Sequence, residues 1–280
     1  MRLQHIVEHV YTRPWAITPA GWDSIHNIVQ SKLRGEIADF RAEDGEDEDI
    51  FGEKLPGYAF ENGTGIIPVK GVIARKIGLV GKMCGGCDLI DIENNLALAL
   101  NDDYVERIVL DVDSPGGSVT GVPEVARRIK EADAIKPVYA YTDGMMCSAA
   151  YWLASQARGI VCTPTAEVGS IGVYMAILDY TRAMEMEGTK LELFKAGALK
   201  AMGLPGTTLT EEMRDHLQAQ VDTIYDWFTS AVKSRRPTVS EETMQGQSFM
   251  GDDASARELV DGIADNWLAA MEEFKTYDNH

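Results

Sequence analysis

A polar pair, Cys147-Ser148, lies between two apolar segments in the stretch DGMMCSAAYWLAS, residues 143–155. Either side chain could act as a nucleophile. The residues that follow have a helical pattern, and a helix that begins at Ser148 would point its first amides and the positive end of its dipole at the serine oxygen. That environment suits a nucleophile, but a serine also commonly caps a helix without doing chemistry. These residues alone favour the cap.

A nucleophilic serine needs a base, and histidine is the usual one. The chain has five histidines: His5, His9, His26, His216 and His280. Three lie within the first 26 residues and one is the last residue, so a Ser-His-Asp triad is poorly supported. A lysine that is buried away from water has a lowered pKa and can act as the base instead. The stretch ELFKAGALKAMGLPG places Lys195 and Lys200 in a glycine-rich loop whose apolar residues could exclude water, although two ordinary solvated lysines would show the same pattern.

A further candidate for chemistry is the turn in LDVDSPGGS, where a hydrophobic strand stops at Pro115. Gly116 and Gly117 leave the backbone free to adopt unusual angles and let a ligand approach closely. Unshielded amides at such a turn can bind the oxyanion of an acyl-transfer reaction. The stretch lacks the Gly-Lys-Ser/Thr ending of a phosphate-binding loop and is not a GxGxxG motif. On its own it also fits an ordinary tight turn.

Two other patterns resemble metal sites. His5-Ile-Val-Glu8-His9 fits the inverted zinc-protease motif H-x-x-E-H, but it lies near the start of the chain and no third ligand can be identified. Cys84-Gly-Gly-Cys87 has metal-ligand or redox spacing, but a zinc site would need a second close pair, which the other two cysteines do not form. We therefore expect neither a metal nor a cofactor.

The chain of 280 residues is strongly acidic, with a formal net charge of −18. An acidic surface disfavours nucleic acid, whose phosphates need lysine and arginine, and it disfavours anionic membranes. The N-terminus has no apolar core of the signal-peptide kind, and no window is long and apolar enough to span a membrane. These features predict a cytoplasmic protein that has no membrane anchor and does not bind nucleic acid.

The order of predicted elements indicates an α/β fold. Residues 1–55 form an N-terminal extension with a helix at 20–33 and an acidic linker at 36–54, and residues 56–280 form one domain. Three roles stay open for the extension: a propeptide, a docking arm or an integral part of the fold. The predicted strands of the domain are 65–73, 107–113, 136–142, 159–164 and a strand that 168–178 enters after a glycine turn. The predicted helices are 88–101, 122–133, 148–157, a long one at 208–236, and one or two within 256–274.

Seven blocks stand in order between residues 65 and 265: IPVKGVI, LDVDSPGGSV, KPVYAYTDGMMCSAAYWLAS, PTAEVGSIGV, KAGALKAMGLPG, LTEEMRDHLQAQVDTIYDWFTSAV and GDDASARELVDGIAD. Each block is modest alone, and the set in this order is specific. Together they resemble the serine peptidases of the signal peptide peptidase A family, including their phage-encoded relatives that process capsid proteins. The resemblance implies a layered α/β fold of the ClpP/crotonase type with flanking helices.

The resemblance also implies roles for individual residues. Ser148 falls on the nucleophile, Lys200 on the general base, and Ser170, in VGSIGV, on the hydroxyl that orients the lysine amine. Gly116 or Gly117 would supply an oxyanion amide, together with the amide of Ser148. These roles make residues 56–280 a Ser-Lys peptidase domain.

The chain departs from the family pattern around the nucleophile. Ala149-Ala150 replace residues that are usually small and glycine-rich, and Cys147 replaces a residue that is usually small and apolar. Alanine keeps the site open but is less flexible than glycine. We expect the Cys147 side chain to point into the packed interior.

The function that the resemblance implies is a serine endopeptidase acting on proteins or peptides. Family members form homo-oligomeric rings in which the serine and the lysine can come from neighbouring copies. The leading WAITP segment and the acidic stretch look most like phage members, which cleave scaffold, portal or capsid proteins during head assembly, in the host cytoplasm or the procapsid. Three alternatives stay open: a non-catalytic assembly factor or an acyl-CoA enzyme on the same fold, and a cellular peptide-degrading homologue.

Overall fold

The centre of the molecule is a six-stranded sheet in the order β13-β10-β8-β6-β3-β2. The structure, a computed structural model, describes residues 13–33, 57–76 and 85–277, so the acidic linker, the motif at residues 5–9 and Cys84 lie outside the described residues. Neighbouring strands from β13 to β3 are parallel, and β2 pairs antiparallel with β3. The strands are β2 (Ala59–Glu61), β3 (Thr64–Lys70), β6 (Arg107–Asp113), β8 (Val138–Thr142), β10 (Gly159–Cys162) and β13 (Gly262–Ile263).

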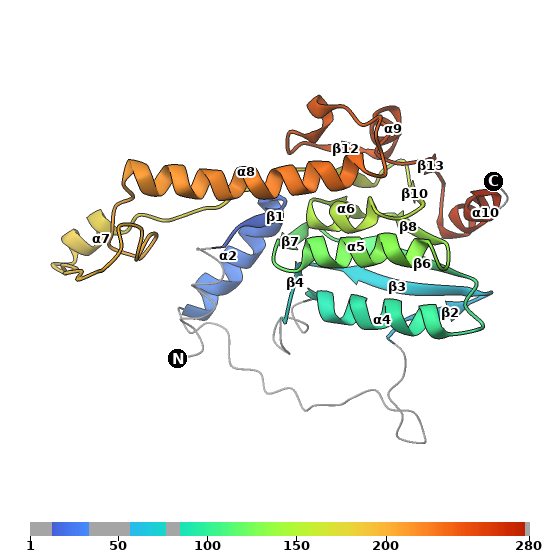
Figure 1. Cartoon of the computed structure of the whole chain (residues 1–280), viewed down its shortest axis with the longest axis horizontal. Helices are drawn as coiled ribbons and strands as arrows, with labels where there is room; N and C mark the ends of the chain where they lie inside the picture. The colour runs from blue at the N-terminus through green and yellow to red at the C-terminus, as the bar shows by residue number, and fades with distance from the viewer. Residues whose placement is uncertain (1–12, 34–56, 77–84, 278–280) are drawn as a thin grey trace, which may run out of the picture.

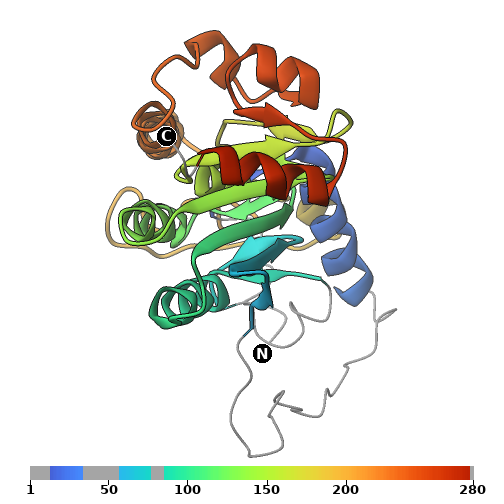
Figure 2. The same cartoon turned by 90° about the vertical axis from the view of Figure 1, so that its right-hand side faces the viewer.

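Helices cover both faces of this sheet, because its central strands are apolar on both sides (Figure 1, Figure 2). Leu110 of β6 belongs to the main core, whereas its neighbour Val109 packs with Tyr139 on the opposite face. The ring of Phe274 stacks on Tyr139 there, with ring centroids 4.5 Å apart. The helices of the main core include α4 (Leu89–Asn101), α5 (Val122–Asp133) and α6 (Ala149–Ala154), and α10 (Trp267–Tyr277) covers the other face. The α/β class with flanking helices is confirmed.

Four of the central strands each run into a short strand at their carboxyl end. β3 leads to β4 (Ile73–Ala74), β6 to β7 (Gly116–Ser118), β8 to β9 (Met145–Cys147) and β10 to β11 (Glu167–Gly169). The short strands pair in two smaller sheets, ordered β1-β7-β4-β5 and β12-β11-β9. Their other members are β1 (Trp15–Ile17), β5 (Cys87–Asp88) and β12 (Ser248–Met250). The carboxyl edge of the central sheet, where ligands bind in open α/β sheets, is therefore built from tight backbone turns.

The described part of the N-terminal extension packs onto the body. Helix α2 (Pro19–Leu33) confirms the predicted helix, and β1 before it pairs antiparallel with β7. All three residues of β1 are buried. Strand β1 is thus part of a sheet, while the predicted boundary near residue 55 lies outside the described residues.

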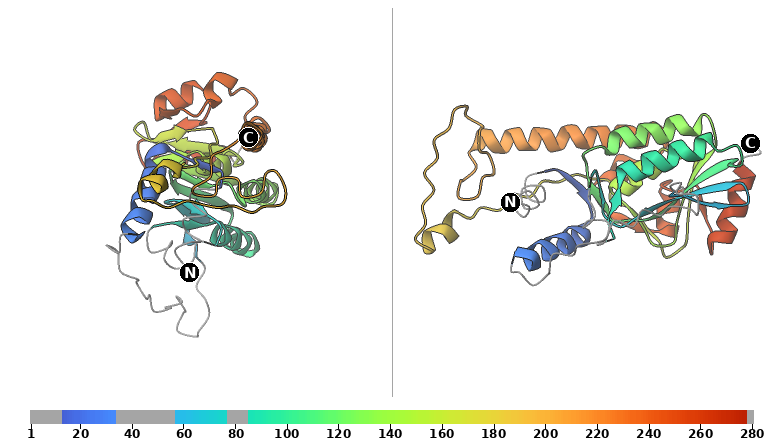
Figure 3. Two further views of the ribbon diagram at one scale, coloured as in Figure 1. Left: turned by 90° about the vertical axis from the view of Figure 1, so that its left-hand side faces the viewer. Right: turned by 90° about the horizontal axis from the view of Figure 1, so that it is seen from below.

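A long arm projects from the body (Figure 1, Figure 3). Helix α8 (Glu211–Lys233) lies within the predicted range 208–236 and is capped by Thr210, whose side chain accepts a hydrogen bond from the Met213 amide. Its last turns pack on the body, where Phe228 stacks on Trp152 of α6 with ring centroids 4.5 Å apart. Its first turns lie away from the central sheet with α7 (Thr181–Met186), and the long connection between α7 and α8 lies there with them.

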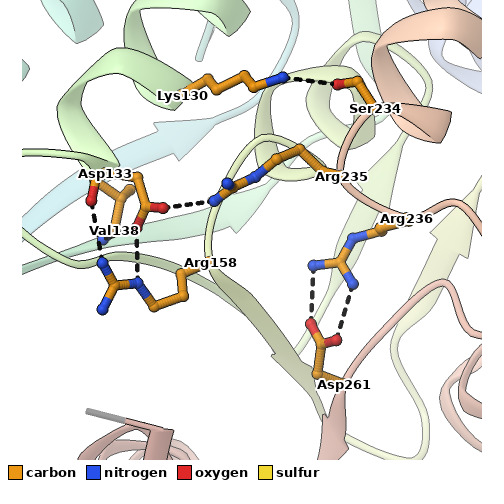
Figure 4. A network of polar contacts seen from close by, with 8 residues as sticks. All are labelled: Lys130, Asp133, Val138, Arg158, Ser234, Arg235, Arg236 and Asp261. Atoms are coloured by element: carbon orange, nitrogen blue, oxygen red, sulfur yellow. Dashed lines mark hydrogen bonds and ion pairs between the residues drawn. The ribbon is translucent and has the colours of Figure 1, made fainter. Parts of the chain in front are cut away.

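Ion pairs fix the body end of α8 (Figure 4). Arg235, just after the helix, donates to a carboxylate oxygen of Asp133 in α5 at 2.5 Å. Asp133 also accepts a hydrogen bond from Arg158 at 3.1 Å. Arg236 is only 6% exposed and pairs with Asp261 through two contacts of 3.0 and 2.8 Å. These contacts connect the end of α8 to α5 through Asp133, and to the residue before β13 through Asp261.

Two predicted elements differ from the structure. The strand expected after the glycine turn in 168–178 instead precedes that turn as β11, because Ser170 has a φ of 51° and leaves the extended conformation. Of the one or two helices expected within 256–274, one forms: α10, which starts only at Trp267, while α9 (Gly251–Ala256) ends where the expected range begins. Between them, β13 pairs with β10, so sheet hydrogen bonds outweigh the helical spacing of the residues.

Replacing Asp261 with alanine should lower the free energy of unfolding by about 2–3 kcal/mol, because the buried guanidinium of Arg236 loses its carboxylate. The change also removes the acceptor for the Ile160 amide. The loss is smaller than for a fully buried pair because Asp261 is 38% exposed. Urea unfolding measures it.

The control for this experiment is Lys70→Ala, which breaks a more exposed pair with Asp111. It should cost less than about 1 kcal/mol. Equal losses in the two variants would contradict a special contribution from the buried arginine.

Candidate active site

Ser148 joins strand β9 to helix α6 in a strained backbone conformation. Its φ is 56° and its ψ is −119°, whereas a serine that caps a helix usually has an extended backbone. Its side chain makes no capping hydrogen bond. Its hydroxyl oxygen is buried and has no hydrogen-bond partner among the described residues. Since strained backbone of this kind clusters at functional sites, the structure argues against the cap that the local residues favoured.

Ser170 lies beside Ser148 at the end of the neighbouring strand. Strands β9 and β11 are parallel with Cys147 opposite Gly169, and the Ser148 amide donates to the Gly169 carbonyl at 2.7 Å. Ser170 follows Gly169 as Ser148 follows Cys147. It is buried, and its own amide donates to the carbonyl of Gln247 at 2.8 Å. The fold therefore brings together two of the predicted site residues.

Cys147 points into the protein interior, as expected. It is fully buried, and its sulfur lies 3.5 Å from the carbonyl oxygen of Glu167. Burial raises the pKa of the Cys147 thiol far above its ordinary value, and the negative charge of Glu167 adds to the rise. Because the thiolate is the reactive form of cysteine, Cys147 is a poor nucleophile and Ser148 is the better candidate of the pair.

Gly116 and Gly117 of β7 lie so close to their neighbours that no side chain fits. A Cβ atom on Gly116, whose φ is 103°, would lie 2.8 Å from Ser148 Cβ and 2.3 Å from the carbonyl oxygen of Ala16. A Cβ atom on Gly117 would lie 1.8 Å from the carbonyl oxygen of Ile73. Glycine at both positions thus lets the backbone of β7 approach the nucleophile and two strands at once.

The amides near Ser148 differ from those that the sequence suggested. The Gly116 amide donates to the Ser114 hydroxyl at 3.2 Å, and the Ser148 amide is bonded to Gly169. The amide nitrogen of Ala149 lies 3.1 Å from the Cβ position on Gly116, and as the first amide of a helix it has no intrahelical acceptor. Ala149 is therefore a candidate oxyanion donor that sequence reasoning missed. The signal that could have found it is the start of a helix directly after the serine.

Lys200 is not brought to Ser148 within one chain. It is exposed in the loop that precedes α8. Phe228 marks where α8 contacts the body, and a rise of about 1.5 Å per residue puts the start of the helix roughly 25 Å from that contact. Lys195 is exposed in the same loop, and its amine donates to the carbonyl of Ala198 at 2.8 Å. In the single chain the loop does not exclude water from either amine.

The described residues contain no group of three or more His, Cys, Asp or Glu side chains placed to hold a metal ion. Cys87, one member of the Cys-Gly-Gly-Cys pattern, is buried in β5. None of the helices in residues 13–33, 57–76 and 85–277 is long and apolar enough to cross a membrane.

Comparison with known proteins places the chain in a family. Residues 130–277, just over half of the chain, match the profile of Peptidase family S49. The chain belongs to Peptidase family S49. The matched region includes Ser148, Ser170 and Lys200, whereas the glycines of β7 precede it.

Two curated relatives and one solved structure are similar to this chain over more residues than the family match covers. Among solved structures, a mutant of ClpP1 from Listeria monocytogenes has a TM-score of 0.47 at 12% identity, covering 72% of this chain and 91% of that one. Capsid assembly protease C of Escherichia phage lambda is 35% identical over 209 residues, which cover 74% of this chain and 47% of that protein. This chain therefore spans about half the length of the lambda protein. MJ0651 of Methanocaldococcus jannaschii, named as a protease, is 31% identical over 250 residues, or 84% of this chain and 75% of that protein.

The strained backbone at Ser148 predicts that its glycine variant is more stable than its alanine variant. Ser148→Gly should be more stable than Ser148→Ala by about 1 kcal/mol, because glycine adopts a positive φ without strain. Thermal or urea denaturation of the two variants measures the difference. At Ser234, where φ is −66°, the same two substitutions should fall in the reverse order. If the same substitution, glycine or alanine, gave the more stable protein at both Ser148 and Ser234, a strained backbone at Ser148 would be contradicted.

Proposed function

We propose that this chain is a serine endopeptidase in which Ser148 is the nucleophile and Lys200 is the general base. The observation that carries the proposal is the buried hydroxyl of Ser148, held on a strained backbone without a hydrogen-bond partner among the described residues. A buried serine with a structural role would use its hydroxyl in a hydrogen bond. Membership of a peptidase family supplies peptide hydrolysis as the reaction.

The lysine that completes the site comes from a second copy of the chain. Lys200 is exposed near the end of the projecting arm, and large apolar side chains are exposed along the same arm. They are Leu178, Tyr180, Met186, Leu193, Phe194 and Leu204, and Phe194 is 92% exposed. Exposed apolar surface of this kind marks a protein interface. Docking of the arm on a neighbour would bury these side chains and deliver the amine to the neighbour's Ser148, which favours a homo-oligomeric ring.

In the completed site, the neutral amine of Lys200 takes the proton of Ser148 as the serine oxygen attacks the peptide carbonyl. The tetrahedral oxyanion accepts a hydrogen bond from the Ala149 amide. A second comes from the Gly117 amide, or from the Gly116 amide once it has released the Ser114 hydroxyl. The lysine passes its proton to the leaving amine, and an acyl-enzyme remains. The same amine then activates a water molecule, which releases the acyl group. Ser170, beside Ser148, orients the amine.

The substrates are proteins of a phage head under assembly. The relative from Escherichia phage lambda is named as a capsid assembly protease and is 35% identical. We therefore expect scaffold, portal or capsid proteins as substrates, cleaved in the host cytoplasm or the procapsid. Incubation with purified scaffold and capsid proteins should give a few defined fragments. Uniform degradation of any unfolded protein would favour the peptide-degrading alternative.

Ser148→Ala and Lys200→Ala should each abolish cleavage of a quenched fluorescent peptide. An equal mixture of the two variants should regain about a quarter of wild-type turnover, because one site in four would combine the intact serine of one copy with the intact lysine of the next. The assay is peptide turnover before and after mixing, and native mass spectrometry confirms that mixed oligomers form.

Lys195→Ala is the matched control, because Lys195 lies in the same exposed loop. It should keep wild-type turnover. A mixture that co-assembles and stays inactive would rule out a dyad shared between copies. Turnover by purified Ser148→Ala protein would rule out Ser148 as the nucleophile.

A further inference from the structure

Strand β1 lies between two parts of the candidate site. On one edge it runs antiparallel to the glycine strand β7, with Ala16 opposite Gly117. On its other edge the Trp15 amide donates to the Tyr174 carbonyl at 2.9 Å, and the Tyr174 amide donates to the Trp15 carbonyl at 3.0 Å. Tyr174 lies just after Ser170 in the chain. β1 therefore fills a position one strand wide, with backbone hydrogen bonding on both edges.

The same strand lies against the nucleophile. A Cβ atom on Gly116 would lie 2.3 Å from the carbonyl oxygen of Ala16 and 2.8 Å from the Cβ atom of Ser148. Ala16 and Ser148 therefore both lie against this glycine. Ser148 is 1% exposed and its hydroxyl oxygen is buried. A substrate carbonyl has to reach that oxygen, so an element around it must move. β1 is only three residues long and is not part of the central sheet.

The side chains of β1 divide between two environments. Ala16 packs with the main core, whereas Trp15 and Ile17 form a separate cluster with Val29 of α2. Successive residues of a strand point to opposite sides, so the small side chain faces the body and the large ones face α2. Residues 14–18, PWAIT, carry no charge. A groove that recognises an extended peptide works in this way, with backbone pairing for affinity and pockets for alternate side chains.

We propose that residues 13–18 are an internal substrate mimic, which occupies the groove between β7 and Tyr174 and leaves it when a substrate segment pairs there. This inference rests on the proposed role of Ser148. It also describes the substrate: an extended segment that is uncharged over the five residues matching 14–18, with a small residue at the place of Ala16. The residue there must be small because the core around Ala16 belongs to the body and stays when β1 leaves. Of the three roles open for the extension, the proposal selects an integral part of the fold for residues 13–18, and it makes them an inhibitory segment.

Hydrogen exchange of the full chain, before and after covalent capture of Ser148, tests the proposal. The probe is a peptidyl phosphonate with an alanine-like side chain next to phosphorus, and the intact mass reports the adduct. After capture, amides of residues 13–18 should exchange about tenfold faster or more, because the strand has been displaced. Amides of residues 116–118 and 170–176 should keep their protection, because the captured peptide replaces β1 at both edges.

Two results would count against the proposal in different ways. Unchanged protection of residues 13–18 in protein that carries the adduct would overturn the substrate mimic and make β1 a permanent wall of the groove. Absence of any adduct on folded protein would overturn the nucleophile and, with it, the inference that depends on it.

The variant Ile17→Glu gives a second readout. A charge in the apolar cluster under α2 favours release of β1, so the rate of Ser148 capture should rise about tenfold. A synthetic peptide of residues 13–18 should slow capture of this variant again and have little effect on wild type. Ile135→Glu, at an isoleucine that is 70% exposed, is the matched control and should leave the rate unchanged. An unchanged rate in folded Ile17→Glu protein would contradict the proposal.

Discussion

The hydrogen bond from the Ser148 amide to the Gly169 carbonyl, 2.7 Å long, holds the ends of two short parallel strands in register. This pairing lets Ser148 keep a φ of 56°, a conformation that costs a non-glycine residue about 1–3 kcal/mol. The same register sets Ser170 beside Ser148. Strain and register together produce a serine whose hydroxyl is buried and unpaired among the described residues, at the end of β9 and beside β11 and the glycines of β7.

Packing in the rest of the body holds Ser148 in this strained conformation. Helix α6 is buried along its whole length, and its Trp152 stacks on Phe228 of α8. The carboxylates of Asp133 and Asp261 anchor the end of α8 to the central sheet and its helices. Because four of the central strands turn sharply at the same edge, packing that fixes one turn also limits the movement of its neighbours.

The nucleophile and the proposed base belong to regions of opposite physical character. Ser148 lies in a dense core, whereas Lys200 lies on an exposed arm with exposed apolar side chains. On the proposed mechanism, two separate events complete the site: a second copy supplies the amine, and a substrate segment displaces β1. Hydrolysis would then be confined to assembled copies and to segments that pair with the glycine strand better than the chain's own residues do.

The sequence by itself determined the α/β class and most of the elements, such as the strand at 107–113 and the helix at 122–133, because apolar spacing is a local property. Motifs in a fixed order also singled out Ser148 and Ser170. Only the tertiary structure decided that residues 15–17 pair with β7, because three residues carry no periodic signal of their own. Likewise, the packing of α8, and not the loop around Lys200, keeps that amine away from the serine in one chain. Contacts between residues far apart in the chain decide both features, and no local pattern of residues encodes such contacts.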